Sequence, residues 1–230
     1  MAKLISADLT DNKLCILEYT TTDGKMIPIK PDAFDAEIVS HTYTDIGKII
    51  FQKPITAIRD GVFTRCSDLT SVTIPDSVTE IGNSAFYDCD RLTEFKGKFA
   101  SEDGRCLIID GILNSFAPYG LTQYTIPDCV TTIGDCAFSG CTILTNVTIP
   151  NGVTMIGEGA FMLCENLISL TIPNSVTMIG EYTFYGCSSL TSITIPNCIT
   201  TIGNHAFAEC SSLTSITIPD SVTTIGESAF

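Results

Sequence analysis

The stretch ITIPNCITTIGNHAFAEC, residues 193–210, decides the fold because its pattern recurs at a fixed interval along the chain. The dipeptide Ile-Pro occurs every 23 residues, at Ile126, Ile149, Ile172, Ile195 and Ile218. An earlier copy lies at Ile74, and Phe51 stands in the same phase one step before it. The aligned unit reads L-x-x-I-x-I-P-x-x-V-x-x-I-G-x-x-A-F-x-x-C-x-x. Self-similarity at such a period is typical of a solenoid built from stacked coils.

The period predicts two regions. Residues 46–230 form the solenoid, and residues 1–45, which do not fit the period, form an N-terminal cap. We expect about eight coils, at 46–68, 69–91, 92–120, 121–143, 144–166, 167–189, 190–212 and 213–230. The 92–120 coil is longer than the others and irregular.

Each part of the unit has a physical role. Alternating apolar residues, as at Ile193 and Ile195, predict a short strand with one buried face. The Pro that follows has no N–H for a strand ladder and ends the strand. The V-x-x-I segment predicts a second short strand. The A-F-x-x-C segment is too short for an α-helix and predicts a helical or 3₁₀ turn with Phe and Cys inward. A single coil cannot bury its own apolar face, so stability comes from stacking on its neighbours.

Two hairpins are expected outside the regular pattern. In the cap, LCILEY (14–19) and KMIPI (25–29) flank a Thr-Thr-Asp-Gly turn, which predicts a β-hairpin, and Ala33-Phe34 suggests a degenerate coil. In the 92–120 coil, extended runs at 106–109 and 112–116 meet at Asp110-Gly111, a favoured tight-turn pair. This second hairpin is expected to stand out from the side of the solenoid. It either decorates the coil or contacts a ligand.

Composition excludes several classes of partner. The net charge is −14, from 26 acidic and 12 basic residues, and no basic run occurs. Nucleic acid and anionic membranes are therefore poor partners. The apolar stretches are too short to span a bilayer, so no membrane insertion is expected. No secretory signal fits in MAKLISADLTDN, residues 1–12.

Cysteine and histidine lie close together in the opening stretch, as they do in zinc sites and thiol enzymes. The phase of each residue separates them. Cys198 fills a tolerant turn position, and His205 shares with Cys136 a slot that other coils fill with Ser, Gly or Tyr. Cys210 belongs to a once-per-coil ladder of small buried side chains, formed by Cys66, Cys89, Cys141, Cys164, Cys187 and Cys210. We therefore expect no catalytic residues, no metal and no cofactor.

The 23-residue unit, with its I-P, I-G-x-x-A-F and G-C-x-x-L elements, resembles the BspA-type leucine-rich repeat over residues 46–230. The resemblance implies an α/β, β-rich fold: a right-handed leucine-rich-repeat solenoid, curved, with a parallel sheet on its concave face. It also implies a cell-surface or secreted protein, in some members an adhesin for host matrix proteins or other microbes. We accordingly expect a non-enzymatic protein-interaction module with a protein or glycoprotein ligand. The alternatives are a scaffold segment of a longer repeat array without its own ligand and, from another class, a Cys/His enzyme.

The predicted binding surface is the outward side of the first strand in each coil, because solenoids bind extended partners on concave sheets. Its candidate residues are Ser71, Thr73, Thr125, Asn146, Thr148, Ser169, Thr171, Ser192, Thr194, Ser215 and Thr217. The competing interpretation is that Ser and Thr merely suit an exposed strand. The face has none of the Trp, Tyr and Arg anchors of tight interfaces, so weak, multivalent or glycan-assisted contact is expected.

Overall fold

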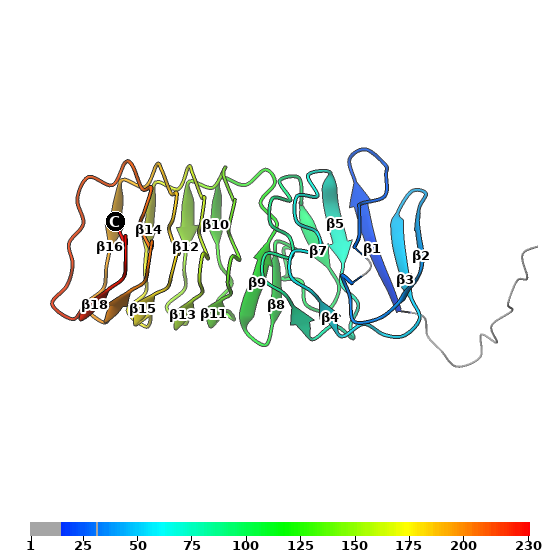
Figure 1. Ribbon diagram of the computed structural model, residues 1–230, viewed down its shortest axis with the longest axis horizontal. Helices are drawn as coiled ribbons and strands as arrows, with labels where there is room; N and C mark the ends of the chain where they lie inside the picture. The colour runs from blue at the N-terminus through cyan, green and yellow to red at the C-terminus, as the bar shows by residue number, and fades with distance from the viewer. Residues whose placement is uncertain (1–14, 31) are drawn as a thin grey trace, which may run out of the picture.

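The computed structural model describes residues 15–30 and 32–230, and over these residues the fold is a β-solenoid without a helix (Figure 1). The coils stack along one long axis, with β16 and β18 near one end and β1, β2 and β3 at the other. The predictions for residues 1–14 lie outside the described residues.

Each regular coil from 121 to 212 contributes two short strands, each paired parallel with its equivalent in a neighbouring coil, as predicted. The I-x-I-P segments form the first sheet, with strands β10 (Gln123–Thr125), β12 (Asn146–Thr148), β14 (Ser169–Thr171) and β16 (Ser192–Thr194) in that order. The V-x-x-I segments form β11 (Thr132–Ile133), β13 (Met155–Ile156), β15 (Met178–Ile179), β17 (Thr201–Ile202) and β18 (Thr224–Ile225). Equivalent residues of neighbouring coils pair directly, as Tyr124 does with Val147.

The N-terminal end departs from the prediction. Strand β1 (Cys15–Thr21) runs antiparallel between β3 (Gly47–Phe51) and β5 (Leu69–Thr73), and β2 (Ile38–Tyr43) flanks β3. The expected hairpin of 14–19 with 25–29 is wrong, since 25–29 forms no strand and the hairpin is β2–β3. The free edge of β5 accepts β1 and so separates β3 from the parallel stack.

The first predicted coil, 46–68, therefore contributes only its second half to the parallel stack. Its strand β4 (Ala57–Ile58) pairs parallel with β6 (Glu80–Ile81), and β5 pairs parallel with β7 (Glu94–Lys96). Phe34 extends the line of buried rings, since its ring centroid lies 6.4 Å from that of Phe63. The domain boundary at residue 45 stays a prediction.

The irregular coil contains the predicted hairpin, formed by antiparallel β8 (Cys106–Ile109) and β9 (Ile112–Phe116). Asp110 and Gly111 both have left-handed φ, 50° and 79°, as a tight type I′ turn requires. The hairpin does not stand out from the side, however. Strand β9 pairs parallel with β11 and takes the place of a V-x-x-I strand, because its alternate residues bury into the same core.

The A-F-x-x-C segment is a run of hydrogen-bonded turns, as predicted, with Ser139 donating to the Cys136 carbonyl at 3.0 Å and Cys141 to that of Phe138 at 3.1 Å, but these turns do not continue into a helix. Alternate backbone N–H groups point to the next coil: Cys136 donates to Glu158 at 2.9 Å, and Phe138 to Ala160 at 2.8 Å. A helix would satisfy these groups internally and leave none for stacking. The turn needs left-handed residues to aim them outward, as at Cys136 (φ 56°) and Gly140 (φ 75°).

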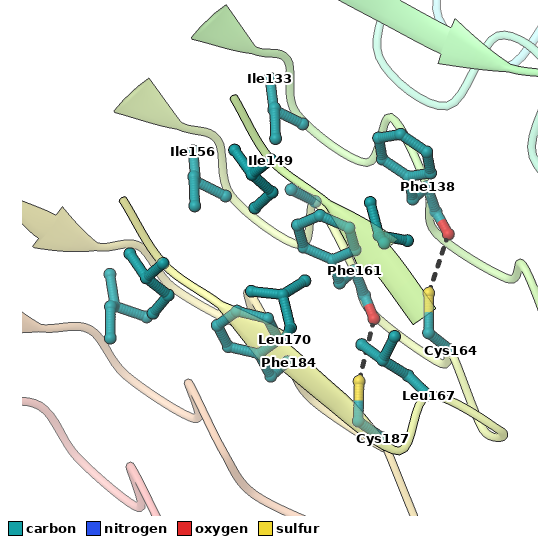
Figure 2. Packing of buried hydrophobic residues seen from close by; sticks show 14 of the residues in the cluster. Ile133, Phe138, Ile149, Ile156, Phe161, Cys164, Leu167, Leu170, Phe184 and Cys187 are labelled. Carbon is teal, nitrogen blue, oxygen red and sulfur yellow. Dashed lines mark hydrogen bonds between the residues drawn. The ribbon is translucent and has the colours of Figure 1, made fainter. Parts of the chain in front are cut away.

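In the regular coils the core is a stack of similar layers, and the predicted Phe ladder is confirmed there. The rings of Phe161 and Phe184 are buried, 5.6 Å apart between centroids and 6° from parallel (Figure 2). Four ladder thiols, those of Cys89, Cys164, Cys187 and Cys210, donate to a Phe carbonyl of the preceding coil. Cys164 Sγ donates to the Phe138 carbonyl at 3.1 Å, and Cys187 Sγ to that of Phe161 at 3.2 Å. Such a cysteine thus packs as a small apolar side chain and also donates a hydrogen bond to a buried carbonyl.

Phe161→Ala should lower the free energy of unfolding by about 3–5 kcal/mol, because it opens a cavity in the middle of the stack. The matched control is Phe230→Ala, at the same ladder position but 53% exposed, which should cost less than about 1 kcal/mol. Urea titration followed by circular dichroism measures both. Equal losses would contradict the buried ladder.

Candidate interaction surface

The outward side chains of β10, β12, β14 and β16 form one continuous surface. They align in two rows across the paired strands, Gln123, Asn146, Ser169 and Ser192 in one, and Thr125, Thr148, Thr171 and Thr194 in the other. We call these eight residues the Thr face. Between the rows, Tyr124, Val147 and Leu170 point into the core. The Thr face carries no charged side chain, and its Thr row is exposed.

The predicted surface is shortened at its N-terminal end. Ser71 is only 5% exposed, because β1 covers it and the Thr20 hydroxyl lies 2.7 Å from the Ser71 hydroxyl. Thr73 is half-buried opposite Glu18. The prediction that Ser71 is an exposed binding residue is therefore wrong. The repeat pattern of 69–91 contains no sign of the strand that covers it.

The surface is also interrupted and ends early. Strand β7 places Glu94 and Lys96 in the two rows, joined by a 2.8 Å ion pair, and β7 is not paired with β10. Glu94 and Lys96 were not among the predicted binding residues, although their phase in the 92–120 coil places them on the outward side of the first strand. Ser215 and Thr217 are exposed, but residues 213–219 form no strand. The continuous sheet surface therefore runs from Gln123 to Thr194.

The Cys/His cluster of the opening stretch does not form a site. The Cys210 thiol donates to the Phe184 carbonyl at 3.1 Å, and the Cys198 thiol to the Val176 carbonyl at 3.0 Å. The His205 ring instead stacks on Tyr182, with centroids 4.9 Å apart. Among residues 15–30 and 32–230, no group of three or more His, Cys, Asp or Glu side chains is arranged to hold a metal ion.

Burial makes the ladder thiols weak acids. It raises the pKa of Cys66 and of Cys210 from 9.0 to about 11, and that of Cys164 well above 9.0. Since the thiolate is the nucleophile, these groups are unreactive at neutral pH. Cys129, in contrast, is exposed at a turn.

The irregular coil borders two hollows. One, between the turns of 69–91 and 121–143, has a volume of about 20 Å³, and Ser139 Oγ lines it without a partner among the described residues. It suits water alone. The other, about 450 Å³, lies beside the hairpin at Asp103, Ile108 and Cys129. Burial acts to raise the pKa of Asp103, but hydrogen bonds from Ser101 and Arg105 hold it below its usual value. A ligand role for the hairpin stays a prediction.

With a thiol reagent at pH 7.5, the folded protein should show rapid labelling at Cys129, whereas the six ladder thiols should react only on unfolding. Mass spectrometry of quenched time points locates the label, and Cys129→Ser should remove the fast phase. Rapid labelling of Cys210 beside His205 would instead favour a thiol enzyme.

Stability should fall in alkali. The unfolded thiol releases its proton near 9.0, whereas folded Cys66 holds it to about 11, so the unfolded state binds fewer protons in between. The stabilisation is therefore complete below pH 9 and is lost as the pH rises to 11. Thermal midpoints measured across this window should decline, and the double variant Cys66→Ala, Cys210→Ala should decline less steeply. A parallel decline in both would contradict the assignment.

Comparison with known proteins agrees with this geometry. A family model described as the BspA type leucine rich repeat region matches residues 15–100 and 113–230, in six copies. A leucine rich cell surface protein from Faecalibacterium prausnitzii is 32% identical, with a TM-score of 0.63 over 76% of this chain and 52% of its own. The pneumococcal vaccine antigen PcpA, 20% identical, shares the fold with a TM-score of 0.63, over 76% of this chain and 46% of its own.

The chain thus spans about half the length of these solved structures. No curated protein sequence matches it. The six family copies cover both the regular coils and the N-terminal strands, so the match is to the whole stack rather than to one coil. This chain belongs to the BspA-type leucine-rich repeat family.

Proposed function

We propose that the chain is a non-enzymatic interaction module that binds a protein or glycoprotein through the Thr face and acts, adhesin-like, at the cell surface or outside the cell. The observation that carries the proposal is the Thr face itself: two straight rows of hydroxyl and amide groups on four paired strands. A surface that offers the same groups in each coil suits an extended or repetitive partner.

The chemistry of the surface indicates the kind of contact. Thr148, Thr171 and Thr194 are exposed, short and uncharged, so they bind through hydrogen bonds at little cost in side-chain entropy. A surface without large anchors gives low affinity per site. Repetition of the same groups along the stack raises the overall affinity. A partner that binds one coil is held at high effective concentration beside the next coil.

The family supports the proposed location at the cell surface or outside the cell. The Faecalibacterium prausnitzii relative is described as a cell surface protein. Over residues 15–30 and 32–230, no helix has the length and apolarity to cross a membrane.

A scaffold role, as one segment of a longer array without its own ligand, is the second candidate. It is favoured by the regularity of the stack, because most repeated positions are explained by packing alone. Under this alternative the Thr face binds nothing, and the experiment below distinguishes the two.

The triple variant Thr148→Lys, Thr171→Lys, Thr194→Lys should weaken binding to immobilised host matrix proteins at least tenfold, because long charged side chains block the row. Surface plasmon resonance with the full chain measures it. The matched control is Thr154→Lys, Thr177→Lys, Thr200→Lys, which adds the same charge to exposed positions before β13, β15 and β17.

Binding should survive in the control. Equal losses in both triple variants would assign the effect to charge and remove the Thr face from the proposal. Absence of binding by the unaltered chain to any matrix protein would favour the scaffold role.

A further inference from the structure

Three aromatic side chains, one exposed and two half-buried, cluster at the turns of the 167–212 coils, away from the Thr face. Tyr182 is 39% exposed, and its ring stacks on His205 with 4.9 Å between centroids and 14° between planes. Tyr185 meets Tyr182 edge-on at 5.8 Å. We call Tyr182, Tyr185 and His205 the aromatic patch.

Packing does not account for these residues. The slot of Tyr182 and His205 is filled in other coils by Ser84, Gly159 and Ser228, so the core needs no ring there. The backbone conformation does not favour a bulky side chain there either, since Tyr182 and His205 both have a φ of 53°, where glycine is least strained. Every residue in this slot has a left-handed φ, including Ser84 (55°), Gly159 (58°) and Ser228 (49°), so the backbone conformation belongs to the repeat and only the two rings are particular to these coils.

The two faces of the Tyr182 ring have different neighbours. Residues in this slot stack coil on coil, so the neighbours of Tyr182 are His205 on one side and Gly159 on the other. His205 covers the first side. Gly159 has no side chain to cover the second, and the Cys136 thiol and Met162 border the space beside Gly159. Tyr182 remains 39% exposed, so a partner can reach it.

The charges around the patch are all negative. All 12 Lys and Arg residues of the chain lie at or before Arg105. Residues 106–230 therefore contain acidic side chains but no Lys or Arg. The acidic residues are Asp110, Asp128, Asp135, Glu158, Glu165, Glu181, Glu209, Asp220 and Glu227. Glu181 precedes Tyr182 in the chain, and Glu158 holds the same ladder position one coil earlier. The ion pairs of the described residues involve lysines and arginines no later than Lys96, so within residues 15–30 and 32–230 no Lys or Arg pairs with these carboxylates.

We propose that the aromatic patch binds a basic segment of a partner protein, with a Lys or Arg side chain over Tyr182 and its charge paired with Glu181. A cation within about 6 Å of a tyrosine ring is attracted to the ring face, and carboxylate pairing adds a charge-assisted hydrogen bond. The methylene stem of the cation packs along Met162. Tyrosine is also an anchor residue of protein interfaces, and the Thr face exposes none. This inference does not depend on binding at the Thr face.

The test uses the full chain and a fluorescein-labelled nona-arginine peptide, with fluorescence anisotropy at low and at physiological salt. The unaltered protein should bind the peptide, and added salt should weaken the binding. A nona-glutamate peptide and a neutral Gly-Ser peptide of equal length should not bind.

The variants are chosen from residues that other coils carry at the same positions. Tyr182→Ser with Tyr185→Ala copies Ser228 and Ala208, so the fold should persist, as an unchanged thermal midpoint would show. This double variant should bind nona-arginine at least fivefold more weakly. Failure of the unaltered chain to bind, or equal affinity in the double variant, would overturn the proposal.

A charge-matched pair separates the patch from the overall negative charge. Glu181→Asn copies Asn204, and Asp128→Asn copies Asn151, and each removes one carboxylate. Glu181→Asn should weaken binding about threefold or more, whereas Asp128→Asn should leave it unchanged. Equal effects would show unspecific attraction and overturn the patch.

Discussion

The stacking of each coil on the next is the interaction on which the whole structure depends. Backbone N–H groups such as that of Phe138 donate to the following coil, and thiols such as that of Cys164 donate back to the preceding one. The Phe rings stack along the same direction. A coil therefore has no complete hydrogen bonding and no complete core without its neighbours. The period of 23 residues is held for this reason, because a shift by one residue would displace every ladder at once.

This constraint divides the residues of a coil into two kinds. Inward positions such as those of Phe161, Ile156 and Cys164 must match the coils above and below. Outward positions do not have to match the neighbouring coils, so the residues that bind a partner are expected at these positions. The Thr face keeps one chemistry over four strands, which suits a partner that extends along the stack. The aromatic patch occupies two coils only, which suits a single anchoring side chain. The two surfaces lie on different parts of the coil and differ in polarity, so they offer different kinds of contact.

Most of the regular solenoid could be predicted from sequence, since its contacts join equivalent residues and the period alone gives the pairing. The hairpin of the irregular coil was also predictable, because Asp110-Gly111 fixes a local turn. Its placement was not, since pairing of β9 with β11 depends on which sheet edge is free. The turns of the A-F-x-x-C segment were predictable, but local spacing does not reveal that Cys136 and Phe138 direct their N–H groups to the next coil.

The sequence by itself determined the repeat, the inward residues, the unreactive setting of the ladder cysteines and the separation of Cys198, His205 and Cys210 into different positions. Only the tertiary structure decided which outward residues form a surface. Ser71 is buried because β1, distant in sequence, pairs with β5, and Tyr182 is accessible because its neighbour in the slot is a glycine. Phase along the chain gives the direction of a side chain, whereas exposure depends on what else packs beside it.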